Sequence, residues 1–114
     1  MAVLIFSYAF FGLVMVGLAI PLIRRKIRPN GAYGFRFASA MADPEVWYPV
    51  NAYGGRLMLI YGGLILAAAL LLGWLLPRNE GVYVLLMTLL LLGGLVPITI
   101  LTYRLTQTLA RRQP

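Results

Sequence analysis

Side chains that could recognise an anionic ligand are concentrated in residues 24–55. They include a guanidinium at Arg36, an indole at Trp47 and an amide at Asn51, with a phenol at Tyr33. A guanidinium can donate two parallel hydrogen bonds to a phosphate or a carboxylate. These groups therefore suit an anionic headgroup or a peptide carboxylate, and one interpretation is that they line a small pocket or a docking surface.

The composition excludes most catalytic chemistry. The chain has no cysteine and no histidine, which excludes thiolate metal sites, iron–sulfur clusters, imidazole acid–base catalysis and the usual axial ligand of haem. In residues 24–55 the carboxylates are Asp43 and Glu45, and no hydroxyl has a base beside it. We expect a protein that acts by binding, with no enzymatic activity, metal or cofactor.

Apolar residues dominate the 114-residue chain. Hydrophobic residues make up 61% of it and charged residues 11%, whereas soluble domains are roughly 45–50% apolar and about 25% charged. A chain this short cannot bury so much apolar surface in a core of its own. A soluble monomer is thereby excluded.

Three uncharged stretches, residues 1–23, 57–77 and 81–103, have the length of membrane spans. At about 1.5 Å per residue, each can cross a hydrocarbon core about 30 Å thick. The breaker residues Pro77–Gly81 predict a tight hairpin between the last two. The sequence predicts a single all-α integral membrane domain, residues 1–114, with transmembrane helices near 3–23, 56–76 and 82–103.

The basic residues predict how the chain is oriented. Of its ten Lys and Arg residues, nine lie in residues 24–56 or 104–112, which three spans place on one side, and Arg78 lies on the other. Cytoplasmic segments carry the excess of basic residues. We expect the N-terminus outside and the C-terminus in the cytoplasm. The net charge of +7 then needs no nucleic acid as a partner, and the basic run attracts anionic lipid headgroups: Arg24, Arg25, Lys26 and Arg28.

The segment between the first two spans carries three local signals. Pro29-Asn30-Gly31 predicts a turn, and aromatic residues alternate from Tyr33 to Phe37, as in an extended strand. Asp43-Pro44-Glu45 is typical of a helix start, with an Asp cap and a Pro in the first position. We expect a short interfacial helix from Pro44 that bends or ends at Pro49.

A structural role is the alternative for the polar residues of this segment. Arg36 could pair with Asp43 or Glu45 and so tie the extended part to the short helix. Asn30 and Asn51 could hydrogen-bond loop backbone, whose polar groups must be satisfied at a membrane boundary. The sequence leaves the structural and the ligand-binding interpretations open.

Small residues recur along one face of the second span. Their spacing predicts close helix packing, because small residues let helices approach each other in lipid. The same chain could supply the partner helices, or the face could serve a homo-oligomer or a partner subunit. The residues of this face are Gly55, Gly62, Ala69 and Gly73.

Residues 29–55 resemble the signature of the SdpI family of bacterial membrane proteins. That signature has a Pro-Asn turn, then Tyr-Gly-x-Arg, then Glu-x-Trp, an Asn four residues later and a Gly at the mouth of the next helix. Phe37 stands where the family usually has Thr, and Pro49 lies between the Trp and the Asn. The matching residues are Pro29, Asn30, Tyr33, Gly34, Arg36, Glu45, Trp47, Asn51 and Gly54 or Gly55.

The resemblance implies a location in the bacterial inner membrane and a role in immunity or signalling. The family's namesake protects its host from a secreted peptide toxin and captures a cytoplasmic repressor. The expected partners are anionic lipids and another membrane protein or a second copy of the chain. The alternative is a small accessory subunit of a larger membrane complex, such as a respiratory or photosynthetic assembly.

Overall fold

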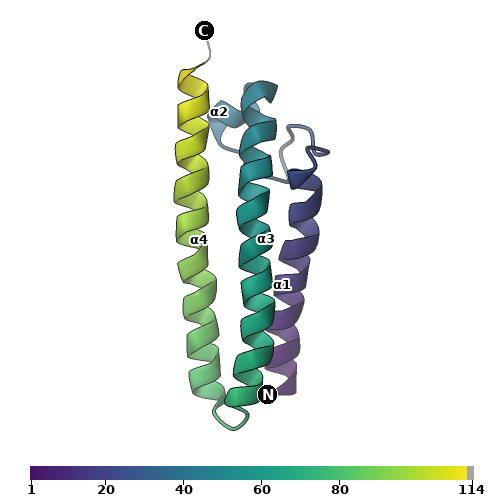
Figure 1. Cartoon of the computed structure of the whole chain (residues 1–114), viewed down its shortest axis with the longest axis vertical. Helices are drawn as coiled ribbons and strands as arrows, with labels where there is room; N and C mark the ends of the chain where they lie inside the picture. The colour runs from purple at the N-terminus through teal and green to yellow at the C-terminus, as the bar shows by residue number, and fades with distance from the viewer. Residues whose placement is uncertain (113–114) are drawn as a thin grey trace.

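Three long helices form an elongated bundle in the computed structural model, which describes residues 1–112 (Figure 1). The bundle measures 58 × 22 × 19 Å, and the residues described form no strand. Each long helix is long and apolar enough to cross a membrane. The predicted all-α class with three membrane-spanning helices is confirmed. The helices are α1 (Ala2–Ile23), the short α2 (Ala38–Met41), α3 (Pro44–Leu75) and α4 (Glu80–Arg111).

α3 is the central helix, and it packs on α1 along one side and on α4 along the other (Figure 1). The turn between α3 and α4 makes these two helices antiparallel neighbours, as the sequence predicts. Asn79 caps the start of α4 by accepting a hydrogen bond from the Val82 N–H at 3.2 Å. We call the end of the bundle at residues 76–79 the hairpin end. The opposite end, which holds residues 24–43, is called the loop end.

Glycines bring α1 and α3 into close contact. A Cβ atom placed on Gly62 would lie 2.7 Å from the Gly12 carbonyl oxygen, and one on Gly12 would lie 2.7 Å from the Gly62 carbonyl oxygen. On the same face of α3, Gly55 lies against Ala19 and Gly73 against Ile5. The small residues of this face thus pack mainly within the chain.

Ala69 shares the face of Gly62 and Gly73, and its backbone also links α3 to α4. It is fully buried, and its carbonyl oxygen accepts a hydrogen bond from the Tyr83 hydroxyl of α4 at 3.1 Å. Tyr61 makes the corresponding bond in the middle of the bundle, to the Leu91 carbonyl oxygen at 2.9 Å. Tyrosine side chains therefore separate α3 from α4, whereas α1 and α3 are in direct contact through glycines.

The start of α3 differs from the sequence prediction. Asp43 caps the helix through the Glu45 N–H at 2.9 Å, as predicted, but the helix continues through Pro49 to Leu75. The prediction that a separate short helix ends at Pro49 is therefore wrong. Residues 24–43 form the connection between α1 and α3, and the short helix in this connection is α2. α4 likewise continues past the predicted end at residue 103 to Arg111.

Burial explains why Pro49 does not end the helix. A proline in a helix interior costs about 3 kcal/mol, because one hydrogen bond is lost and the ring crowds the preceding turn. Val46 and Val50 lie on either side of Pro49 and are fully buried with Trp47. Each buried valine contributes about 1.5–3 kcal/mol, so packing at the loop end offsets the cost of the proline.

Gly62→Ala is expected to destabilise the α1–α3 interface. The new methyl group would meet backbone atoms of α1, which cannot move aside independently, and overpacking of this kind costs about 1–3 kcal/mol. Gly63→Ala is the matched control, because a Cβ there meets nothing within 4 Å. Thermal unfolding in detergent should show a lower Tm for Gly62→Ala alone. Equal effects of the two changes would contradict the role of this close approach.

Candidate functional site: the loop end of the bundle

The turn predicted at residues 29–31 is held by the side chain of Asn30. Its Oδ1 accepts hydrogen bonds from the N–H groups of Ala32 at 2.8 Å and Tyr33 at 2.7 Å. Its Nδ2 donates to the carbonyl oxygens of Arg28 at 2.7 Å and Tyr33 at 3.1 Å. One amide thus satisfies four backbone groups, and Pro29, half-buried, precedes it in the same turn.

Trp47 anchors the connection to the first turns of α3. Its side chain is fully buried, and its indole N–H donates to the Ile27 carbonyl oxygen at 2.8 Å. Ala40, Val46 and Val50 are buried around it. The indole therefore fills the core of the loop end and satisfies a backbone carbonyl at the same time.

Asn51, one helical turn after Trp47, binds the extended part of the connection. Its Oδ1 accepts from the Phe35 N–H at 2.5 Å, and its Nδ2 donates to the Phe35 carbonyl oxygen at 3.4 Å and to the Trp47 carbonyl oxygen at 3.0 Å. Only 2% of Asn51 is exposed. The amide thus pairs with both the N–H and the C=O group of Phe35, as the backbone of a neighbouring β-strand would.

Two glycines make room for this contact. Gly34 has φ +114°, a conformation that L side chains rarely adopt, and a Cβ there would lie 2.7 Å from the Asn51 Oδ1. Gly54 lies one turn after Val50 and carries the Phe35 ring directly on its backbone, where a Cβ would overlap the ring. Gly34 thereby leaves room for the Asn51 amide and the Trp47 ring, and Gly54 leaves room for the Phe35 ring.

Tyr33 and Arg36 lie at the edge of this arrangement. The Tyr33 hydroxyl donates to the Leu18 carbonyl oxygen of α1, and burial raises the pKa of the Tyr33 phenol, so it remains a donor at neutral pH. Arg36 is exposed and donates to the Gly31 carbonyl oxygen. Within residues 1–112 it pairs with neither Asp43 nor Glu45, so the predicted ion pair is wrong.

The basic residues after α1 face outward. All four are exposed, and Arg25 has a positive φ of 59° that turns the chain out of α1. Glu45 is exposed as well, in the first turn of α3. The outer surface of the loop end therefore carries Arg24, Arg25, Lys26, Arg28 and Arg36 around a buried interior.

The arrangement favours the structural interpretation of the motif. Trp47 and Asn51 are buried and hydrogen-bonded, so they do not line an open pocket with Tyr33 and Arg36. What the motif builds is a fixed connection, packed on α3, that presents basic side chains on its outside.

Sequence reasoning missed the apolar partners of the motif. Phe37 stacks edge-on against Tyr103 of α4, with ring centroids 5.4 Å apart, and Leu105 and Leu109 of α4 pack on the Trp47 cluster. The alternating aromatic pattern placed Phe35 and Phe37 on one face of the connection. It contained no signal that α4 extends far enough to meet them.

Gly34→Ala is expected to loosen the connection, whereas Gly31→Ala is not. Alanine at position 34 would be strained at φ +114° and would press on Asn51, and such strain costs on the order of 1–3 kcal/mol. Position 31 has open space around it. Fluorescence of Trp47 in a Trp74→Phe background should shift to longer wavelength, as the indole meets water, in Gly34→Ala alone. An unshifted Gly34→Ala spectrum would contradict this packing.

Comparison with known proteins adds one finding to this geometry. The model of the SdpI/YfhL protein family matches residues 26–101, which include the whole motif and most of α3 and α4. Comparisons with curated proteins and with solved structures returned no match. With its membrane-spanning helices and more than half of its length matched, the chain belongs to the SdpI/YfhL protein family.

Proposed function

We propose that the protein is a non-enzymatic inner-membrane protein that acts by binding, in immunity to a membrane-active peptide toxin or in signalling. Its contact surface is the basic exterior of the loop end. One observation carries this proposal: the polar side chains of the motif are bonded to the protein's own backbone. Asn30, Trp47 and Asn51 are thus occupied as structural donors and acceptors. The side chains left for a partner are the exposed basic ones, including Arg36, whose bond to the Gly31 carbonyl oxygen uses only part of the five N–H donors of a guanidinium.

A preformed surface suits a binding protein. Ordering a flexible segment costs free energy when a partner binds, and a segment already fixed avoids that cost. Here Asn30, Trp47 and Asn51 fix the connection from inside. Arg36 projects from the most constrained part of it, between Phe35 and Phe37, which makes it the basic residue with the best-defined position for a carboxylate or phosphate.

In this proposal the loop end is cytoplasmic, since it carries nine of the ten basic residues. Single cysteines test the orientation directly, because the chain has none of its own. Ala32 is exposed in the connection, and Gly81 is exposed at the hairpin end. A membrane-impermeant maleimide should label Gly81→Cys in intact cells and Ala32→Cys only after the membrane is opened. The reverse pattern would contradict the orientation.

Deletion of the gene is expected to sensitise the host to the secreted peptide fraction of its own cultures. Growth inhibition is the measurement. The wild-type protein should restore resistance, and so should Arg78→Ala, which removes an exposed basic residue at the hairpin end. Arg36→Ala should not restore it, although immunoblotting should find equal amounts of each variant in the membrane.

Two outcomes would contradict this role. Unchanged sensitivity of the deletion strain would remove the immunity function. Stoichiometric migration of the 12.6 kDa chain within a large assembly on a native gel would make the protein an accessory subunit instead. Equal rescue by Arg36→Ala and Arg78→Ala would show that Arg36 is not part of the contact surface.

A further inference from the structure

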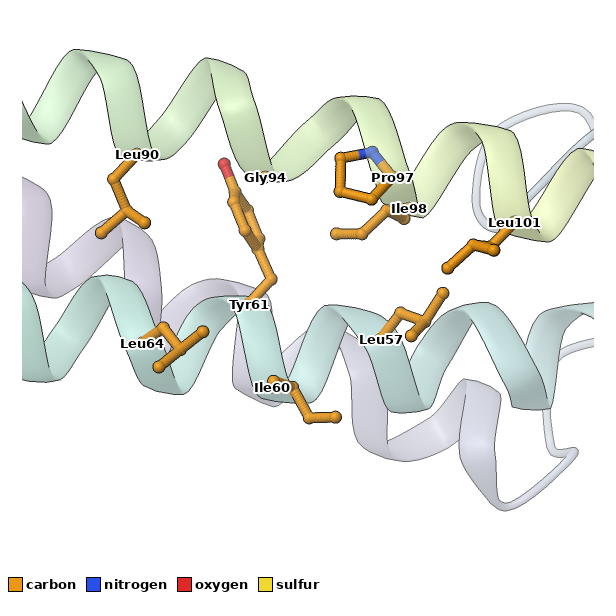
Figure 2. Close-up of a pocket in the computed structure, with 9 residues that line it drawn as sticks. All are labelled: Leu57, Ile60, Tyr61, Leu64, Leu90, Gly94, Pro97, Ile98 and Leu101. Atoms are coloured by element: carbon orange, nitrogen blue, oxygen red, sulfur yellow. The ribbon is translucent and has the colours of Figure 1, made fainter.

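The bundle has an apolar groove between α3 and α4, away from the motif (Figure 2). The groove has a volume of about 180 Å³ and is open on its outer side. It follows α3 from Leu57 to Leu64 and α4 from Leu101 back to Leu90. At 1.5 Å per residue it is roughly 10–16 Å long, and it lies midway along α3 and α4.

Tyr61 keeps this groove open. Its ring lies over Gly94, where a Cβ would come within 2.5 Å of it, and its hydroxyl is bonded to the Leu91 carbonyl oxygen. The ring therefore acts as a spacer that keeps α4 from approaching α3 more closely. Beside the ring, Gly94 has no side chain and that of Pro97 is short, so part of the space between α3 and α4 stays unfilled (Figure 2).

Two arginines lie just beyond the groove, on the side that faces the loop end of the bundle. Arg56 is four residues before the groove-lining Ile60, and Arg104 is three residues after Leu101, so each lies one turn further along the same face of its helix. Ile60 and Leu101 are 59% and 40% exposed, so these faces point outward. Both arginines are exposed, and neither forms an ion pair in the part of the chain that the structure describes.

No acidic side chain in the described part of the chain, residues 1–112, pairs with these arginines. The three acidic residues are Asp43 and Glu45 at the start of α3 and Glu80 at the start of α4. Asp43 and Glu45 are more than two helical turns from Arg56, and Glu80 is at the hairpin end. A guanidinium at the membrane boundary suits a phosphate, to which it donates two parallel hydrogen bonds.

We propose that this groove binds one anionic phospholipid, with an acyl chain along Tyr61 and Leu101 and its phosphate between Arg56 and Arg104. The shape favours a lipid over a helix. A helix is about 10–12 Å across and would need a matching face along the whole span, whereas this groove has a volume of only about 180 Å³ and ends at Leu64 and Leu90. The site is separate from the motif and does not depend on the proposed function.

Native mass spectrometry of the full chain in mild detergent tests the charge requirement. The probes are phosphatidylglycerol, which is anionic, and phosphatidylcholine, which is not. The wild-type chain should retain one phosphatidylglycerol in preference to phosphatidylcholine. Arg56→Gln/Arg104→Gln should weaken that retention on the order of tenfold. Arg111→Gln/Arg112→Gln loses the same charge at the same end of the bundle and should retain the lipid as the wild type does.

A second pair of variants tests the groove without changing charge. Leu101→Trp should fill the groove and reduce retention of the lipid, whereas Leu92→Trp, on an exposed part of α4 outside the groove, should not. Equal retention by both arginine variants, equal retention of both lipids, or equal effects of both tryptophan changes would overturn the proposal. A dimer without bound lipid would overturn it too, because a second copy would then cover the groove.

Discussion

Hydrogen bonding of backbone at the edge of a membrane is the constraint on which the loop end depends. The connection between α1 and α3 has no strand partner and only one short helix, so several of its N–H and C=O groups take partners from side chains. Asn51 supplies them for Phe35, and Trp47 supplies one for Ile27. Because both side chains come from the buried face of α3, helix and connection hold each other in place.

This mutual support accounts for the length of α3. Without the connection, Trp47, Val50 and Asn51 would be exposed at a helix end weakened by Pro49. With it they are buried, and the helix is continuous for 32 residues. The motif residues that suggested a ligand site in the sequence thus form mainly the buried interior between the connection and α3. The contact surface that we propose is the outside of this segment, above all the guanidinium of Arg36.

The sequence was sufficient for the features that depend on local or additive properties. Charge-free stretches predicted the three spans, and the cap at Asp43 predicted a helix start at Pro44, although as a short helix separate from the second span. It was insufficient where tertiary packing decides: Pro49 is a breaker locally but is outweighed by burial, and Arg36 bonds to the Gly31 carbonyl oxygen, although carboxylates lie nearby in the sequence. The contact between Phe37 and Tyr103 also depends on a three-dimensional arrangement, because 66 residues separate them in the chain.

The two sides of α3 differ in what they leave available to other molecules. Against α1, glycine backbones meet and leave no room for another group, so that interface has one geometry. Against α4, Tyr61 and Tyr83 are bonded to carbonyl oxygens, and free volume remains beside the Tyr61 ring. The close α1–α3 contact thus fixes the relative position of these two helices, and the α3–α4 interface is the one that leaves an apolar groove, with Arg56 and Arg104 one turn beyond it.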